Sequence, residues 1–515
     1  GNTILEKDVK QVIFSAMCIG WKELAYYLKR KNPSIKIKAF WHGSISQVSE
    51  PYGWQRNMEL IDMCKDGTIS VFGTCKASLV KFYKNLGWIM YIDEAKKARR
   101  RIENIIVKTP LLHSDIFSKL SSNDVFMKCE NLQVTGAYKI RGALNKISQL
   151  SEEEKKKGVV CSSAGNHAQG VAYASSLLGI ESTIVMPKTT PYLKVQSTRN
   201  YGGNTVLFGS CYDDAFLEAK RIEKEEGKVF IPPFDDFDII YGQGTIALEI
   251  LEDLPEVDYI VCPIGGGGLI SGISLVAKSI NPNVKIIGVQ ATGAPSMYES
   301  INRGERITLD EVNTIADGIA VKSPGEKTFE IVGKYVDEII TVTESEIVDA
   351  FLLLSEKHKL LGEASGVVSL AALNKIDCND KKICSVISGG NIDMLTISNL
   401  INNGLVSGGR LFCFSVELPD VPGQLVEISQ ILSEENANVV KLEHNQFKAI
   451  NRINNVLLEV TVETNGHEHI NQIIKHFKFS DNAYLLVYAF LTYAIYIWFI
   501  RKYSTDFLMS MLLFI

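Results

Sequence analysis

Four consecutive glycines separate two apolar stretches of this chain. They are Gly265–Gly268, within the segment Tyr259-Ile-Val-Cys-Pro-Ile-Gly-Gly-Gly-Gly-Leu-Ile-Ser-Gly272. The residues before them have the composition of a buried strand, and residues 269–280 are typical of a helix. A backbone without side chains can approach a ligand closely, and a helix N-terminus offers N–H groups to a phosphate. The alternative is a flexible linker, which the flanking strand and helix argue against.

The spacing of these glycines restricts the kind of phosphate that they would bind. It is not Gly-x-x-x-x-Gly-Lys-Ser/Thr, so a nucleoside triphosphate is not expected. It is also not a clean Gly-x-Gly-x-x-Gly fingerprint followed by an acid that binds a ribose. The sequence therefore predicts a phosphate-binding loop that serves some other phosphorylated ligand.

An unusual lysine lies upstream, in Thr135-Gly-Ala-Tyr-Lys-Ile-Arg-Gly-Ala-Leu144. Lys139 follows a small, bendable turn and opens the apolar segment 140–147. Because burial disfavours a charged amine, such a lysine can act as a nucleophile near neutral pH. The alternative is an exposed lysine at the start of a helix. Together with the glycine-rich segments, Lys139 predicts a phosphorylated cofactor that is held as a Schiff base.

Two further polar loops follow strand-like runs. One is Ser162-Ser-Ala-Gly-Asn-His-Ala-Gln-Gly170, and the other is Ser388-Gly-Gly-Asn391. In open α/β sheets, ligands bind beyond the carboxyl ends of the strands, where such loops gather. The alternative for the first loop is an ordinary helix start capped by Ser163 or Asn166, with His167 as a structural residue.

The bulk properties indicate a large α/β protein. A length of 515 residues predicts about three domains, and apolar runs alternate with helical patterns through most of the chain. A net charge of −5 gives no reason to expect nucleic acid as a partner. None of the ten cysteines forms a Cys-x-x-Cys pair, so we expect reduced, buried thiols and a cytoplasmic location.

Residues 1–92 form the first predicted unit, an α/β segment. A helix is expected at residues 21–31, and strands are expected near residues 12–17, 35–40, 68–73 and 88–92. The segment resembles the N-terminal half of a GT-B glycosyltransferase, through Trp41-His-Gly-Ser and residues 72–84. No second half with a nucleotide-sugar site follows, and we assign no chemistry to this unit.

Residues 93–478 resemble a fold type II pyridoxal-phosphate enzyme, and closely a threonine dehydratase (threonine ammonia-lyase) of the catabolic type. The resemblance rests on the motifs above and on Gly242-Gln-Gly-Thr. It implies a two-domain catalytic core with open twisted sheets at residues 93–400, and pyridoxal 5'-phosphate as the cofactor. It also implies an amino-acid substrate and assembly into a homo-oligomer, either a dimer or a tetramer.

The resemblance implies a role for each motif. Lys139 would carry the cofactor as a Schiff base, and Asn166 would contact the ring hydroxyl. Ser388 would hydrogen-bond to the pyridine nitrogen. The phosphate would be held by Gly265, Gly266, Gly267, Gly268 and Leu269. The substrate carboxylate would be bound by Ser163, Gly165, Asn166 and His167.

The implied reaction converts L-threonine to 2-oxobutanoate and ammonia, and L-serine to pyruvate. A serine cannot keep the pyridine nitrogen protonated as a carboxylate would, which favours loss of the β-hydroxyl over transamination. Related serine racemases have an acid/base serine where this chain has Ala164, which argues for dehydration. Where their metal site begins with a carboxylate this chain has Gln290, so no metal is predicted there. Another β-eliminase or racemase of the same fold, or an inactive fused binding or membrane protein, remains an alternative.

Residues 410–480 form a separate predicted unit with the order βαββα. This small α+β unit resembles an ACT regulatory domain, and the resemblance implies that Asp420 and Gly423 contact a small amino-acid effector. The alternative is a structural dimerisation module.

The last predicted unit, residues 483–515, is a hydrophobic tail. Residues 483–500 are eighteen uncharged residues, which just reach the length of a membrane-spanning helix. The tail stands where an ACT domain would have its last strand. The alternative is therefore a fusion or a gene-model error at both ends of the chain.

Overall fold

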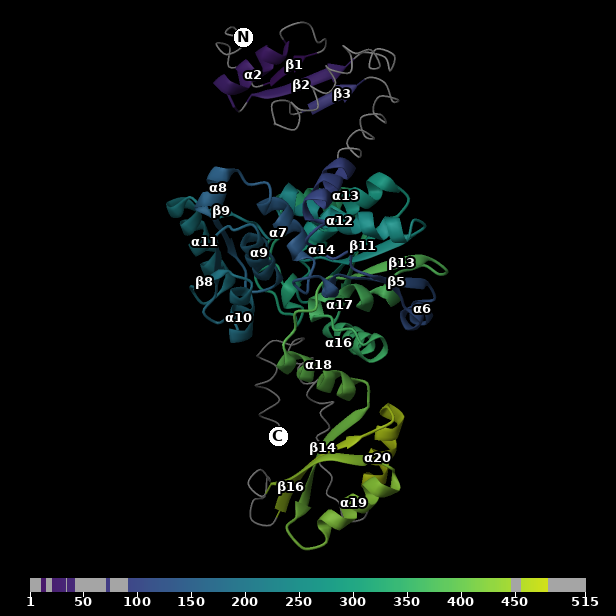
Figure 1. Ribbon diagram of the computed structural model, residues 1–515. Helices are drawn as coiled ribbons and strands as arrows, with labels where there is room; N and C mark the ends of the chain where they lie inside the picture. The colour runs from purple at the N-terminus through teal and green to yellow at the C-terminus, as the bar shows by residue number, and fades with distance from the viewer. Residues whose placement is uncertain are drawn as a thin grey trace.

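The computed structural model describes residues 11–14, 21–33, 35–41, 71–74, 91–445 and 455–479. These residues contain four sheets (Figure 1). The largest sheet has, in spatial order, β12 (Glu338–Val342), β11 (Lys285–Ala291), β10 (Tyr259–Pro263), β13 (Lys382–Ile387), β5 (Asp124–Cys129) and β4 (Leu111–His113). All of its pairs are parallel except β4 with β5. The expected α/β class is therefore confirmed.

The six-stranded sheet is buried on both faces. In β10, Ile260 and Cys262 pack in one apolar cluster with residues of α12 (Phe237–Asp253) and α13 (Gly268–Ile280). Val261, between them, packs in a second cluster with residues of α16 (Glu344–Leu353) and α17 (Ala364–Ala371). Helices on both sides explain why these strands are continuous apolar runs and do not alternate with polar residues.

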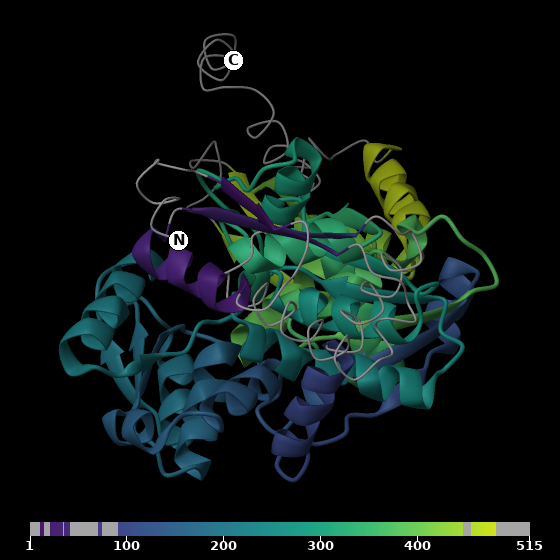
Figure 2. The same cartoon turned by 90° about the horizontal axis from the view of Figure 1, so that it is seen from above.

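A smaller parallel sheet has the order β8 (Asn204–Leu207), β7 (Ser182–Met186), β6 (Val159–Ser162), β9 (Val229–Phe230). Its neighbouring helices are α7 (Lys139–Ile147), α9 (Asn166–Leu177), α10 (Tyr192–Asn200) and α11 (Tyr212–Glu226). Apolar residues of α7 and α9 share one cluster with β6, while α11 packs on the opposite side of β6 and β7. Figures 1 and 2 both show this blue-to-teal unit beside the six-stranded sheet.

Further helices complete the catalytic region. They are α6 (Asp115–Ser121), η1 (Glu130–Leu132), α8 (Glu152–Lys157), α14 (Ser296–Arg303), η2 (Asp317–Ile319), α15 (Glu326–Tyr335), η3 (Leu354–His358), η4 (Leu373–Lys375) and α18 (Met394–Ser407). The helix η3 is a π-helical turn that continues α16. In Figure 1, α18 lies between this region and the C-terminal sheet.

The C-terminal unit has the expected element order. It consists of β14 (Leu411–Pro419), α19 (Gln424–Glu434), β15 (Asn438–Asn445), β16 (Asn455–Glu463) and α20 (His467–Phe479). The sheet is antiparallel with the order β14-β16-β15, and β14 and β16 alternate buried and partly exposed residues. The assignment of this unit as an ACT domain stays a prediction.

The described N-terminal elements are β1 (Gln11–Phe14), α2 (Trp21–Lys31), β2 (Lys36–Trp41) and β3 (Val71–Thr74). The three strands form a parallel sheet in the order β1-β2-β3, as a βαβ pattern predicts. The GT-B resemblance of this segment stays a prediction.

The prediction of a strand at residues 88–92 is wrong for residues 91 and 92, the two that the structure describes. Residues 91–102 are helical. Tyr91, Ala95, Ala98 and Ile102 recur every three or four residues, and the last three are fully buried. The ring of Tyr91 meets that of Tyr335 edge to face, with centroids 6.3 Å apart. The apolar residues at position 91 and beyond therefore form one face of a helix.

The motif Gly242-Gln-Gly-Thr lies inside α12. Helix α7 crosses α12 at this point. A Cβ atom on Gly242 would lie 2.6 Å from the carbonyl oxygen of Arg141. The glycine thus permits close helix packing and does not mark a loop.

The described cysteines are all free thiols. As expected, Cys129, Cys161, Cys262 and Cys384 are buried. Cys211 is exposed, contrary to that expectation, because it immediately precedes α11 at the surface.

Within the described ranges, no helix is both long and apolar enough to cross a membrane. The stretch at residues 483–500, which the sequence offers as a candidate, lies outside these ranges. The position of the last ACT strand lies outside them too.

Candidate active site

Lys139 is the first residue of α7 and is partly buried. Its Nζ donates a hydrogen bond to the carbonyl oxygen of Pro233 at 2.8 Å. Burial lowers the pKa of the amine to about 8, although the charge of Glu363 opposes this change. A substantial fraction of Lys139 is therefore neutral at slightly alkaline pH, which is the state that a nucleophile or a general base requires.

The turn before α7 is attached to the loop that follows β13. Gly136 adopts a φ of 70°, a conformation that favours glycine. Its carbonyl oxygen accepts from the amide of Gly390 at 2.8 Å, and the amide of Tyr138 donates to the carbonyl of Ser388 at 3.1 Å. The structure thus brings Lys139 and the Ser388 loop together, as expected for loops at the carboxyl ends of parallel strands. Ser388 is 4% exposed.

Asn166 joins the same cluster. It opens α9 directly after β6, and its Nδ2 donates to Oε1 of Glu363 at 2.6 Å. A Cβ atom on Gly389 would lie 2.6 Å from that Oε1 and 3.1 Å from Asn166 Nδ2. The three loops that contain Lys139, Asn166 and Ser388 therefore converge on one small volume.

The residues expected to bind a substrate carboxylate lie in the turn around Asn166. The hydroxyl of Ser163 accepts from the amide of Gly165 at 3.3 Å. The ring of His167 is buried, and its Nε2 lies 2.9 Å from the carbonyl oxygen of Ile231. Burial and the nearby Lys139 charge lower the pKa of His167 to about 3, so the ring is neutral and Nε2 carries the proton. The imidazole is thus bonded to the backbone of a neighbouring segment, and its part in substrate binding stays a prediction.

The glycine run leads into α13, which begins at Gly268. Gly267 adopts a φ of 96°, and no side chain in the described part of the chain caps the helix at this position. A Cβ atom on Gly266 would lie 2.4 Å from the ring of Phe234, and one on Gly268 would lie 2.8 Å from Cβ of Phe234. The first N–H groups of α13 are therefore not used by a side chain, and Leu269, within the first turn, is 3% exposed.

These features fit pyridoxal 5'-phosphate. Phe234, which packs on the glycine run, immediately follows Pro233, which accepts from Lys139. Lys139 and the glycine run before α13 thus contact two adjacent residues of the same segment, Pro233 and Phe234. The Lys139 amine could bond to the aldehyde of a cofactor, and the N-terminus of α13 could bind its single phosphate.

Glu363 is a site residue that was not singled out from the sequence. It is 7% exposed, and it precedes α17. Burial raises its pKa to about 7, the charge of Asp317 adds to this effect, and the hydrogen bond from Asn166 opposes it. The available signal was an acid between an apolar run and a helix, but its contact with Asn166 spans 197 residues.

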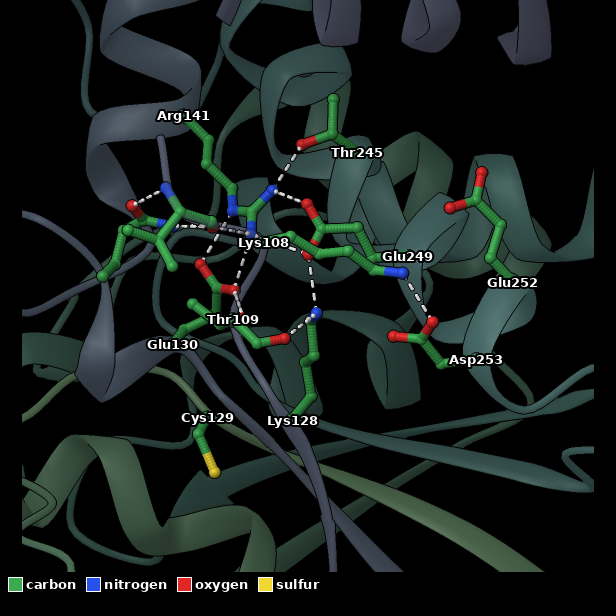
Figure 3. A network of polar contacts seen from close by, with 12 residues as sticks. Lys108, Thr109, Lys128, Cys129, Glu130, Arg141, Thr245, Glu249, Glu252 and Asp253 are labelled. Atoms are coloured by element: carbon green, nitrogen blue, oxygen red, sulfur yellow. Dashed lines mark hydrogen bonds and ion pairs between the residues drawn. The ribbon is translucent and has the colours of Figure 1, made fainter. Parts of the chain in front are cut away.

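A buried ionic network connects α7 to the neighbouring elements (Figure 3). Arg141 is fully buried and binds both oxygens of Glu130, at 2.8 Å each, and both oxygens of Glu249, at 2.6 and 3.0 Å. Lys128 donates to Glu249 at 2.6 Å and to the carbonyl of Thr109 at 2.7 Å. Two cations and two carboxylates thus neutralise one another and tie α7 to β5 and α12.

Three further residues were singled out from the sequence: Gln290, Asp420 and Gly423. The Gln290 amide donates to the carbonyl of Ile264 at 3.2 Å and accepts from the amide of Tyr298 at 2.8 Å. The predicted absence of a metal there stays a prediction. Asp420 and Gly423 are in the C-terminal unit, where Gly423 precedes α19 with a φ of 102°.

The α/β fold, the partly buried lysine and the glycine-lined helix N-terminus together are typical of enzymes that use a phosphorylated aldehyde cofactor. Residues 102–389 match the family described as "Pyridoxal-phosphate dependent enzyme", and the chain belongs to this family. The family resemblance predicted from the sequence motifs is therefore confirmed.

Several named proteins are similar to this chain. The L-threonine ammonia-lyase of Thermotoga maritima is 48% identical over 383 residues, which are 74% of this chain and 96% of that protein. The Escherichia coli protein named L-threonine dehydratase catabolic TdcB is 45% identical over 313 residues, which are 60% of this chain and 95% of that protein.

Two solved structures are similar as well. The processed form of threonine deaminase isoform 2 from Solanum lycopersicum has a TM-score of 0.59 and 36% identity, and the match covers 61% of this chain and 87% of that one. Maize serine racemase has a TM-score of 0.58 and 39% identity, and covers 61% of this chain and 98% of that one.

Proposed function

We propose that this protein is a pyridoxal-phosphate-dependent L-threonine ammonia-lyase. It converts L-threonine to 2-oxobutanoate and ammonia, and L-serine to pyruvate as a second reaction. The observation that carries the proposal is that the Lys139 amine, with its depressed pKa, bonds to Pro233, while the glycine run at the N-terminus of α13 packs on the next residue, Phe234. The similarity to L-threonine ammonia-lyases over nearly their whole length supports the choice of reaction.

Each residue in the cluster has a role that its chemistry supports. Bound pyridoxal phosphate supplies an aldehyde that bonds to amines and a ring that delocalises negative charge. The loop Gly265–Gly268 and the amide of Leu269 would hold the phosphate by backbone N–H groups. The amide of Asn166 would donate to the ring hydroxyl, and the neutral hydroxyl of Ser388 would hydrogen-bond to the pyridine nitrogen.

Lys139 also acts as the base. With the cofactor bound, the free amine of Lys139 would take the proton from the α-carbon of threonine. A base with a pKa of about 8 can accept this proton and release it again near neutral pH. The backbone N–H groups around Ser163, Gly165 and Asn166, together with the region of His167, hold the substrate carboxylate.

Two residues favour elimination over the alternatives. Ser388 cannot hold a proton on the pyridine nitrogen as a carboxylate would, so the charge at the α-carbon is best relieved by loss of the β-hydroxyl. Ala164 has no group that can return a proton to the opposite face of the substrate, which disfavours racemisation.

Finer properties belong to the same proposal. We propose a homo-oligomeric enzyme in the cytoplasm, with an ACT-like unit at residues 410–480 that binds a small effector through Asp420 and Gly423. The order of elements in that unit supports this assignment.

Substitution of Lys139 tests the catalytic proposal. The Lys139→Ala variant should lose the visible absorbance of lysine-bound cofactor and release no oxo acid from threonine, because no other amine takes its place. The control is Lys156→Ala, which removes an exposed lysine of α8 and should leave both signals unchanged.

The wild-type protein separates the remaining alternatives. Oxo-acid release from threonine supports the proposal, whereas D-serine formed from L-serine without oxo acid would identify a racemase. Absence of both products and of the visible absorbance would favour an inactive protein.

A further inference from the structure

Asn391 lies two residues beyond the Ser388-Gly389 pair and contacts two of the converging loops. Its Nδ2 donates to the carbonyl oxygen of Thr135 at 2.7 Å and to Oδ1 of Asn166 at 2.8 Å. A Cβ atom on Gly136 would lie 2.3 Å from Oδ1 of Asn391, so the amide packs directly on the turn before Lys139. Asn391 thus touches the lysine loop and the Asn166 loop at once.

The direction of each hydrogen bond in this chain of contacts is fixed by one group. The carbonyl of Thr135 can only accept, so the NH2 end of Asn391 must face it. The second N–H of that same NH2 group is then directed at Asn166, which must present its oxygen. The NH2 end of Asn166 is consequently turned the other way, toward Glu363 Oε1 at 2.6 Å.

We infer that Asn391 is a positioning residue of the active site, which fixes the amide of Asn166 with its NH2 end directed toward Glu363 and the cofactor hydroxyl. Without it, an asparagine amide has two orientations of the same shape, and one of them presents an oxygen where a donor is needed. Asn391 acts through Asn166 and does not itself act on the substrate. This inference rests on the proposed function, because the group that Asn166 serves is the cofactor.

The Asn391→Asp variant tests the orientation directly. A carboxylate has almost the same shape but only accepts, so it repels the Thr135 carbonyl and draws the NH2 end of Asn166 toward itself. Asn166 then presents its oxygen to Glu363 and to the cofactor hydroxyl. The dissociation constant of pyridoxal phosphate from the apoprotein should rise by about tenfold or more, because a donor is replaced by an acceptor in a partly buried position.

A double-mutant cycle separates positioning from general structural support. In an Asn166→Ala background there is no amide to orient, so adding Asn391→Asp should leave the dissociation constant unchanged within about twofold. If Asn391 only supported the Thr135 turn, the two effects would multiply. Multiplying effects, or an unchanged affinity in the single variant, would overturn the inference.

Two controls complete the experiment. Asn200→Asp makes the same change in charge at the exposed end of α10 and should not alter cofactor affinity. If Asn391→Asp does not fold, Asn391→Ala serves in the same cycle with a smaller expected effect, because it removes the donor without adding a charge. Failure of wild-type apoprotein to bind pyridoxal phosphate would refute the proposed function, whereas wild-type binding with multiplying effects would refute only the role of Asn391.

Discussion

At the scale of single residues, the carboxyl of Glu363 is held in a place that favours its neutral form. Burial is the largest cause, and the charge of Asp317 adds to it, so the pKa is raised from 4.5 to about 7. Between pH 4.5 and about pH 7, Glu363 is therefore ionised in the unfolded chain and protonated in the folded protein. Glu363 therefore stabilises the fold fully below pH 4.5, and this contribution is lost as the pH rises toward 7.

The Glu363→Gln variant should remove this pH dependence. Glutamine keeps an oxygen that can accept from Asn166 and has no proton to lose. Relative to wild type, the apoprotein of the variant should gain up to about 3 kcal/mol in free energy of unfolding between pH 4.5 and pH 7, with no further change above that. Urea unfolding at a series of pH values measures the difference.

A surface glutamate provides the comparison for Glu363. Glu153→Gln on α8 changes the same functional group in an exposed position, and its unfolding curve should follow that of wild type at every pH. Parallel curves for Glu363→Gln and wild type would contradict the assignment of a raised pKa to this residue.

Sequence reasoning located site residues that are part of a local pattern. Lys139 follows a small-residue turn, and Gly265–Gly268 separates a strand from a helix, so each carries its own signal along the chain. Asn391 lies in a polar loop that the sequence does mark, but neither its role nor that of Glu363 can be read from the local pattern. Their roles depend on contacts with Asn166 across 197 and 225 residues, which only the packing of the two sheets creates.

At the scale of elements, α7 is fixed by charges that are fully removed from water. Arg141 lies two residues after Lys139 and binds Glu130 of η1 and Glu249 of α12 (Figure 3). Burial alone would lower the pKa of Arg141, but the two carboxylates outweigh it and raise the pKa. The network is neutral only when all four of its charged groups are present, so removing one leaves an unpaired charge in the core.

Loss of the Arg141 charge should therefore destabilise the protein strongly. The Arg141→Met variant retains most of the side-chain volume but leaves two carboxylates with one lysine. The free energy of unfolding should fall by about 3–5 kcal/mol. The matched control is Arg221→Met on α11, where an exposed arginine pairs with Glu218 and Glu225. That change should leave the free energy of unfolding close to that of wild type, because exposed ion pairs contribute little.

Helices and strands could be predicted from the sequence where one period of apolar residues dominates a segment. Buried strands such as β10 and β13 were visible as short apolar runs, and the alternating strands β14 and β16 as period-two patterns. The error at Tyr91 and Ile92 arose because a short apolar run fits either a strand or one face of a helix. The contact of Tyr91 with Tyr335, which resolves the choice, is not local in sequence.

At the scale of the whole molecule, the apolar clusters divide the chain. The three large clusters of the catalytic region draw their buried residues from between Ala95 and Leu400. The cluster of the C-terminal unit draws its own from between Phe412 and Phe477. No buried residue of these clusters is shared across the boundary, so the two regions should fold as separate units.

A chain that contains only residues 91–408 should therefore keep the catalytic properties. It should unfold in one cooperative transition, bind pyridoxal phosphate with the visible absorbance of the full chain, and release oxo acid from threonine, because every residue assigned to the site lies within it. What it should lose is any change in threonine affinity caused by an added amino acid, since Asp420 and Gly423 are absent. Calorimetry and rate measurements with and without candidate amino acids check both points. An insoluble or colourless product of 91–408, together with a soluble, coloured chain of residues 91–480, would mean that the C-terminal unit is needed for folding and not only for regulation.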